Sequence, residues 1–114
     1  MLDLFRHIAV ICRADHLISC EATIDEMSEF YKHNEPITLS EIRSRLGDNF
    51  QHLKKVYADY TQEELVEIKT SYWGVSYSRY EWILEIVAHV YHHRGQLHSM
   101  LAQNVREPLV TLFE

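Results

Sequence analysis

Two histidines, His89 and His93, stand four residues apart near the C-terminal end of the chain. On an α-helix this spacing stacks two imidazole rings on one face, about 6 Å apart along the axis, where they can hold one divalent cation. The other positions at the same 3–4 spacing are apolar, as on a helix face that points into a core: Trp82, Ile86, Leu97 and Met100. A neutral imidazole is costly to bury without a partner, and a metal ion satisfies two imidazoles at once. The pattern therefore indicates a metal site inside a helical protein.

A catalytic site for zinc, nickel or ferrous iron usually has three protein ligands and an open position, so a third ligand is needed. The remaining histidines considered for that place are His7, His16, His33, His52 and His98. His7 lies on the apolar face of the first predicted helix, and this geometry favours it over His52. His16 follows Asp15 on a more polar face, and His33 falls in a predicted break. The choice between His7 and His52 stays open at this point.

A simpler interpretation of the histidine pair competes with the metal site. Two core histidines at helical spacing are, on their own, more often hydrogen-bonded than metal-bound. By the same reasoning His92 and His98 are surface residues, while Arg94 and Gln96 make ordinary polar contacts on the helix.

Other catalytic patterns are excluded by their residues. The zincin signature needs a glutamate directly after the first histidine, and Val90 stands there. Di-iron bundles need two Glu-x-x-His pairs, which are absent, as are a Gly-rich phosphate loop and a nucleophile elbow. Cys12 has no base nearby in the sequence to activate it as a nucleophile.

Length and composition indicate one globular domain, 1–114. A net charge of −6 without a basic stripe argues against nucleic-acid binding. The two cysteines, Cys12 and Cys20, are eight residues apart in one predicted helix, too far along its axis to form a disulfide. Two cysteines that do not pair with each other indicate a reducing compartment. The sequence has no signal peptide and no 18-residue apolar run. We therefore expect a cytoplasmic protein that does not enter a membrane.

The elements that must position the histidines are helices. A first helix is predicted from Leu2 to about Tyr31, followed by a polar break at 32–36. Capping boxes, in which a Ser or Thr and a Glu three residues later each satisfy a free backbone amide, open three more helices. These boxes begin at Thr38, Thr61 and Ser78, and the last helix carries the histidine pair to about Gln103.

The segments between and after these helices are predicted to be irregular. Residues 70–76 are aromatic and contain Gly74, and the tail from Asn104, which is broken by Pro108, is expected to be extended. No strand is predicted. The sequence thus predicts an all-α protein with three long helices and one short one.

The segment from His89 to Leu97, with its His-x-x-x-His pair followed directly by Arg-Gly-Gln, resembles the C-terminal signature of the DinB-like superfamily of metal-binding four-helix bundles. Residues 2–9 resemble the second helix of that family, which supplies the remaining histidine ligand. The resemblance covers essentially the whole chain and implies an up-down-down-up bundle with His7, His89 and His93 as metal ligands.

The resemblance also implies an activity. Characterised relatives include thiol S-transferases and isomerases that use a low-molecular-weight thiol such as bacillithiol, mycothiol or glutathione. We expect a divalent metal (zinc, nickel or iron), a small-molecule thiol and an electrophilic substrate, with Arg94 placed to orient a carboxylate. The alternative is a non-catalytic metal-binding or stress-associated bundle.

One feature departs from the family pattern. The family has a long first helix before the one that carries the first histidine, and this chain starts at that histidine-bearing helix. Three helices with apolar faces leave an exposed apolar strip that needs a cover. Either the chain is a truncated form of the family's bundle, or a partner subunit supplies the cover. We expect the second, a homodimer.

Overall fold

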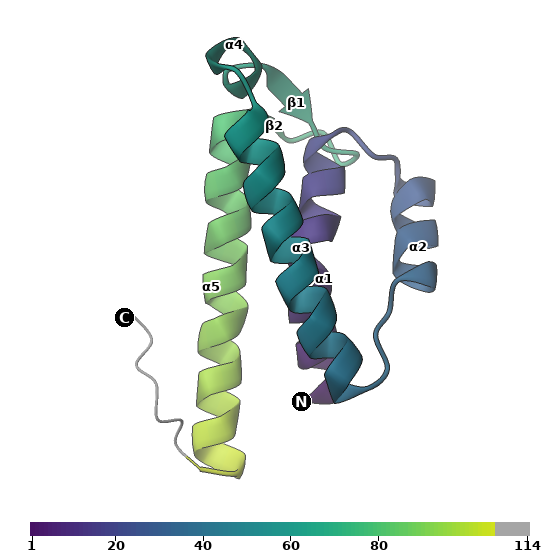
Figure 1. Cartoon of the computed structure of the whole chain (residues 1–114), viewed down its shortest axis with the longest axis vertical. Helices are drawn as coiled ribbons and strands as arrows, with labels where there is room; N and C mark the ends of the chain where they lie inside the picture. The colour runs from purple at the N-terminus through teal and green to yellow at the C-terminus, as the bar shows by residue number, and fades with distance from the viewer. Residues whose placement is uncertain (107–114) are drawn as a thin grey trace.

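The first helix, α1 (Leu2–Ser19), is the centre of the fold (Figure 1). The structure, a computed structural model, describes residues 1–106 of the chain. Four consecutive residues, Ala9 to Cys12, are buried. Consecutive helical residues point about 100° apart, so a buried run of this kind means that other elements enclose α1 on several sides.

Two long helices pack on α1 in opposite directions (Figure 1). α3 (Leu39–Asp59) runs parallel to it: Asn49 donates a 2.9 Å hydrogen bond to the Ala9 carbonyl oxygen in the middle of α1, and the Tyr60 hydroxyl lies 3.5 Å from His16 near the end of α1. α5 (Arg79–Asn104) runs antiparallel, and α2 (Ile24–His33) lies in the connection between α1 and α3. These directions match the down-down-up part of the predicted bundle. The complete up-down-down-up arrangement stays a prediction, and the all-α prediction is correct for the main body of the fold.

Capping boxes define where the helices begin. The predicted boxes at Thr38, Thr61 and Ser78 are confirmed: each hydroxyl accepts a hydrogen bond from the backbone amide three residues on, and each Glu carboxylate accepts one from the backbone amide of the Thr or Ser. The predicted single helix from Leu2 to about Tyr31 is wrong. A fourth box at Thr23 starts α2, and the chain turns between α1 and α2 through Glu21, whose φ of 68° is in the left-handed region.

A small antiparallel hairpin follows the one-turn helix α4 (Gln62–Leu65). Its strands are β1 (Ile68–Thr70) and β2 (Ser76–Ser78), so the prediction of no strands is wrong. Gly74, with a φ of 92°, makes the turn between them in the segment predicted to be irregular. The hairpin is tied to α5 because the indole nitrogen of Trp82 donates a 3.0 Å hydrogen bond to the carbonyl oxygen of Lys69.

The far end of α5 lies close to its predicted position, at Asn104 instead of Gln103. The predicted extended tail with Pro108 falls at 107–114, outside the described residues. None of the helices within residues 1–106 combines the length and apolar character that a bilayer span requires.

α3 and α5 diverge below the hairpin (Figure 1). Side chains of both helices line an apolar groove, which we call the α3–α5 groove. Its cavity has a volume of about 510 Å³, and Cys12 of α1 is among the residues that line it. Four large side chains of its walls are exposed: Leu46, Phe50, Val87 and Tyr91. This groove is the exposed apolar strip that the sequence predicts, and the homodimer that would cover it stays a prediction.

We expect the purified chain to have twice the monomer mass in multi-angle light scattering. Phe50→Glu should convert it to a monomer, because the change places a charge in a desolvated apolar contact. Leu39→Glu is the matched control: Leu39 is more exposed, at 67 %, and lies on the same helix outside the groove. A stable, monodisperse monomer of the unchanged chain would remove the dimer prediction.

Candidate metal centre

Three imidazoles converge between the first two turns of α1 and the middle of α5. Nε2 of His93 lies 2.9 Å from Nε2 of His89 and 3.1 Å from Nε2 of His7. One ligand nitrogen from each ring lies within 4.8 Å of the other two. The structure thus brings His7, rather than His52, to the histidine pair. We call the three residues the histidine triad.

The outer nitrogens of two of these rings are hydrogen-bonded. Nδ1 of His89 lies 2.6 Å from a carboxylate oxygen of Asp15, and Nδ1 of His93 lies 2.7 Å from the amide oxygen of Gln96. Both partners are acceptors, so each Nδ1 carries the proton and donates it. Carboxylate or carbonyl partners of this kind orient metal-ligating histidines in many proteins.

The inner nitrogens are therefore left with lone pairs. A neutral imidazole has one proton, and with that proton on Nδ1 the Nε2 atoms of His89 and His93 are both acceptors. Two lone pairs 2.9 Å apart repel unless a proton or a cation lies between them. Nitrogens that are each about 2.1 Å from one ion lie about 3.0–3.4 Å apart, which is close to the spacing found here. The residues present therefore fit a divalent cation.

The protonation state of His7 also suits a ligand. Burial lowers the pKa of His7, and the neighbouring His93 and His89 lower it further. The ring is then neutral at neutral pH, as metal coordination requires. Burial raises the pKa of Asp15, while its hydrogen bond to His89 opposes that rise.

Sequence reasoning missed both residues that orient the triad. Gln96 stands three residues after His93, one helical turn on, so the i,i+3 rule points to it. Asp15 was noted only as the polar neighbour of His16. It stands eight residues after His7, two turns along the same face of α1, which is the signal for its position.

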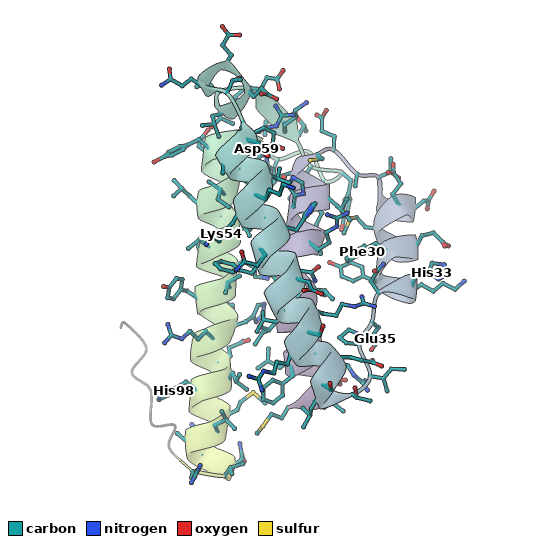
Figure 2. All side chains as sticks on the ribbon, viewed as in Figure 1. Phe30, His33, Glu35, Lys54, Asp59 and His98 are labelled. Atoms are coloured by element: carbon teal, nitrogen blue, oxygen red, sulfur yellow. The ribbon has the colours of Figure 1, made fainter. Side chains whose placement is uncertain are left out.

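The other candidate histidines lie elsewhere. His52 contacts Arg13, and His33 makes an exposed 3.0 Å hydrogen bond with the Glu29 carboxylate. Figure 2 shows His33 and His98 on the sides of α2 and α5 that face away from α1. Their exclusion from the triad follows from these positions.

Arg94 lines the α3–α5 groove, where its guanidinium lies 5.7 Å from the centre of the Tyr91 ring. It does not line the cavities beside the triad. Its predicted role in orienting a carboxylate stays a prediction.

Two cavities adjoin the histidine triad. One, of about 330 Å³, is lined by His7 together with residues of α1, α2 and the α2–α3 linker. The other, of about 200 Å³, is lined by His89 and Asp15, with the aromatic walls Trp73 and Trp82. A ligand next to the triad therefore has room only as a small molecule.

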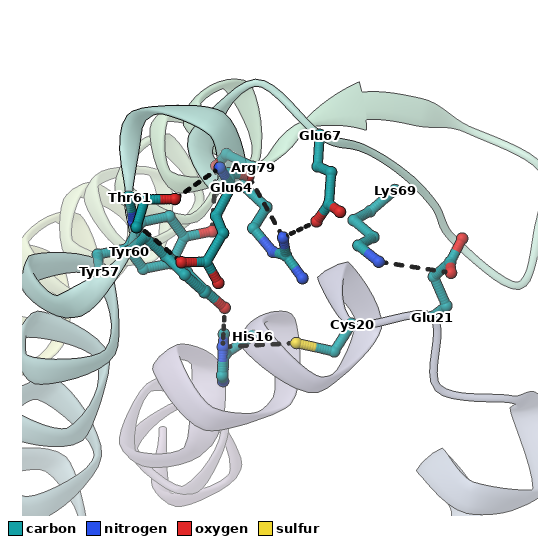
Figure 3. A network of polar contacts seen from close by, with 10 residues as sticks. All are labelled: His16, Cys20, Glu21, Tyr57, Tyr60, Thr61, Glu64, Glu67, Lys69 and Arg79. Carbon is teal, nitrogen blue, oxygen red and sulfur yellow. Dashed lines mark hydrogen bonds and ion pairs between the residues drawn. The ribbon is translucent and has the colours of Figure 1, made fainter.

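The sequence places His16 on a polar face of its helix, and this prediction is wrong. His16 is buried, with 8 % of its surface exposed. Figure 3 shows its Nε2 between the Tyr60 hydroxyl and the Cys20 thiol, each 3.5 Å away. Its Nδ1 is buried without a partner among the described residues. Burial lowers the pKa of His16 to about 4, and the nearby charges of His52 and Arg13 act in the same direction.

The fold and the triad together define a helical protein with a site suited to one divalent cation. No family model matches the chain, and no curated protein matches it. Among solved structures, it is similar to the crystal structure of a protein assigned to the DinB family from Exiguobacterium sibiricum 255-15. The two are 34% identical, with a TM-score of 0.81, and the match covers 98% of this chain and 71% of that one. The chain belongs to the DinB family.

We expect His93→Ala to remove bound metal, because it deletes the nitrogen closest to both other ligands. Asp15→Asn should weaken metal binding about 10–100-fold, the usual effect of losing a partner that orients a ligand. Competition with a chromophoric chelator measures both. His98→Ala, on the same helix but away from the triad, is the control. Unchanged affinity in His93→Ala would contradict the assignment of the site.

A second prediction concerns the pH dependence of stability. The unfolded state binds a proton on His16 below about pH 6.5, whereas the folded state does so only near pH 4, so the free energy of unfolding falls as the pH drops between these values. Between pH 7.5 and 5 this histidine should account for about 2 kcal/mol of the loss.

Urea denaturation of the metal-free protein at the two pH values measures this loss. His16→Gln should show a smaller loss than the unchanged chain, while His33→Gln, at an exposed position, should not differ from it. Equal losses in the unchanged chain and in His16→Gln would contradict the assignment.

Proposed function

We propose that this DinB protein holds one divalent cation with His7, His89 and His93 and transfers a low-molecular-weight thiol to an electrophilic substrate. The observation that carries the proposal is the convergence of three Nε2 atoms, two of which have their partner nitrogens fixed as donors. Family membership supports it, because DinB-like proteins are metal-binding.

The metal supplies the charge that ionises a bound thiol near neutral pH. The protein's own residues do the rest. Asp15 and Gln96 keep the protons of His89 and His93 on Nδ1 and so hold both rings in the ligating tautomer. Three protein ligands leave coordination positions open, and the adjoining cavities limit what enters them.

The transfer itself balances without a redox partner. The thiol proton leaves to solvent, the sulfur electron pair forms a bond to an electrophilic carbon, and the leaving group departs with its bonding pair. Zinc, nickel and ferrous iron all suit three imidazoles, so the native metal depends on availability. Bacillithiol, mycothiol and glutathione are the thiols to test.

The alternative is a metal-binding bundle without catalysis. One observation favours it: the carboxylate closest to the triad, Asp15, is already hydrogen-bonded to His89. No residue pattern in the sequence identifies a general acid or base. A thiol transfer that relies on metal activation alone does not need one, so turnover decides between the two functions.

We expect untagged protein loaded with zinc, nickel or ferrous iron to conjugate one of these thiols to 1-chloro-2,4-dinitrobenzene or monochlorobimane. Turnover should require the metal and should fall at least about 100-fold in His93→Ala, because the site is lost. His98→Ala should keep full turnover. Elemental analysis of each sample gives its metal content.

Two outcomes would count against the proposal in different ways. Full metal occupancy with unchanged activity in His93→Ala would defeat the assignment of the triad. Fully loaded protein that shows no turnover with any of the three thiols would favour the non-catalytic alternative.

A further inference from the structure

The cavity of about 330 Å³ beside His7 has an arginine, Arg6, in its wall. Arg6 and His7 are consecutive on α1, and both line this cavity. A molecule in the cavity therefore touches a ring of the histidine triad and can reach the Arg6 side chain at the same time.

The wall opposite α1 is firmly held. Pro36 is among the largest fully buried side chains, and the amide of Asn34 is engaged on both sides. It donates a 2.9 Å hydrogen bond to the Phe30 carbonyl oxygen and accepts one from Arg45. Figure 2 shows Glu35 in the linker between α2 and α3. The cavity is thus formed before a ligand enters it.

The Arg6 guanidinium has hydrogen-bonding capacity to spare. Its Nη1 lies 3.6 Å from carboxylate oxygens of Asp3 and Glu35, farther than in a charge-assisted hydrogen bond, which is about 2.8 Å. Those two carboxylates are largely exposed, with 96% and 62% of the side chain accessible, whereas the Arg6 side chain is 25% accessible. Its Nε is buried without a hydrogen-bond partner within residues 1–106, so a ligand binds through the terminal Nη atoms. Water screens such pairs, so they are weak competitors for a ligand carboxylate that binds both arms of the guanidinium.

We propose that Arg6 binds the carboxylate of the thiol, so that the site selects thiols of the amino-acid type. Asp3 and Glu35, on either side of Arg6, offset its charge and favour a ligand that also carries an ammonium group over a polyanion. This inference rests on the proposed function, because it places the thiol at the histidine triad. It names the class of thiol by its charged groups.

Cobalt-loaded protein tests the inference, because thiolate coordination changes the cobalt absorption spectrum and reports binding without turnover. The probes are L-cysteine, 3-mercaptopropionate, which lacks the amine, and cysteamine, which lacks the carboxylate. We expect the two carboxylates to bind at least about 10-fold more tightly than cysteamine. Arg6→Gln should weaken L-cysteine about 10–100-fold, leave cysteamine within about 2-fold and keep the cobalt content.

Arg13→Gln is the matched control, since Arg13 lies on the same helix, contacts His52 and does not line the cavity. Arg6→Lys keeps the charge without the planar fork and should give an intermediate loss for L-cysteine. If Arg6→Gln or Arg6→Lys loses affinity for L-cysteine and cysteamine equally, or if neither loses any, the inference is wrong and the proposed function stands. If no thiol changes the spectrum of the fully loaded, unchanged protein, the proposed function itself is wrong.

Discussion

The Nε2 atoms of His89 and His93 both lack a proton and lie 2.9 Å apart, so their lone pairs repel each other. The site depends on how this repulsion is relieved. Hydrogen bonds to Asp15 and Gln96 keep the protons on the far side of each ring. Without a cation, one imidazole must take up a second proton or move. With a divalent cation, all the donors and acceptors are satisfied together.

The packing of α1 makes this arrangement possible. His7 and Asp15 are two turns apart on one face of α1, and α5 runs antiparallel to it, so His7 meets His93 while Asp15 meets His89. Ile11 and Ile86 are two of the largest fully buried side chains; Ile11 lies between His7 and Asp15 on α1, and Ile86 stands three residues before His89 on α5. Apolar burial holds the two helices in register, and the polar contacts then fall where the ligands need them.

Local signals in the sequence predicted the local parts of the structure. The boxes at Thr38, Thr61 and Ser78 each depend on four residues, and each starts a helix as expected. Thr23 and Glu26 form the same kind of capping box, but the apolar residues on both sides of it predicted one continuous helix. The hairpin escaped prediction because its strands are three residues long and depend on α5 for cover.

The site was predictable to the extent that helix periodicity could decide it. The His89–His93 pair follows from spacing alone, and the apolar face of α1 favoured His7 over His52 without settling the choice. The partner of His89 could not be found in this way, because Asp15 is 74 positions away and meets it only through the docking of two helices. For His16 the acidic neighbour was misleading, since Asp15 and His16 are consecutive and point about 100° apart.

The α3–α5 groove and the cavity beside His7 lie on different sides of α1. Cys12 lines the groove and Val10 lines the cavity, and two positions along a helix separate side chains by about 200°. A subunit that covers the groove therefore leaves the entrance beside His7 free. The predicted association through the groove and the proposed ligand binding beside His7 would involve separate faces of the same central helix, so charge introduced at Phe50 should change the mass of the particle without changing its metal content. Loss of metal in such a monomer would show instead that the partner subunit supports the packing of α1 on α5.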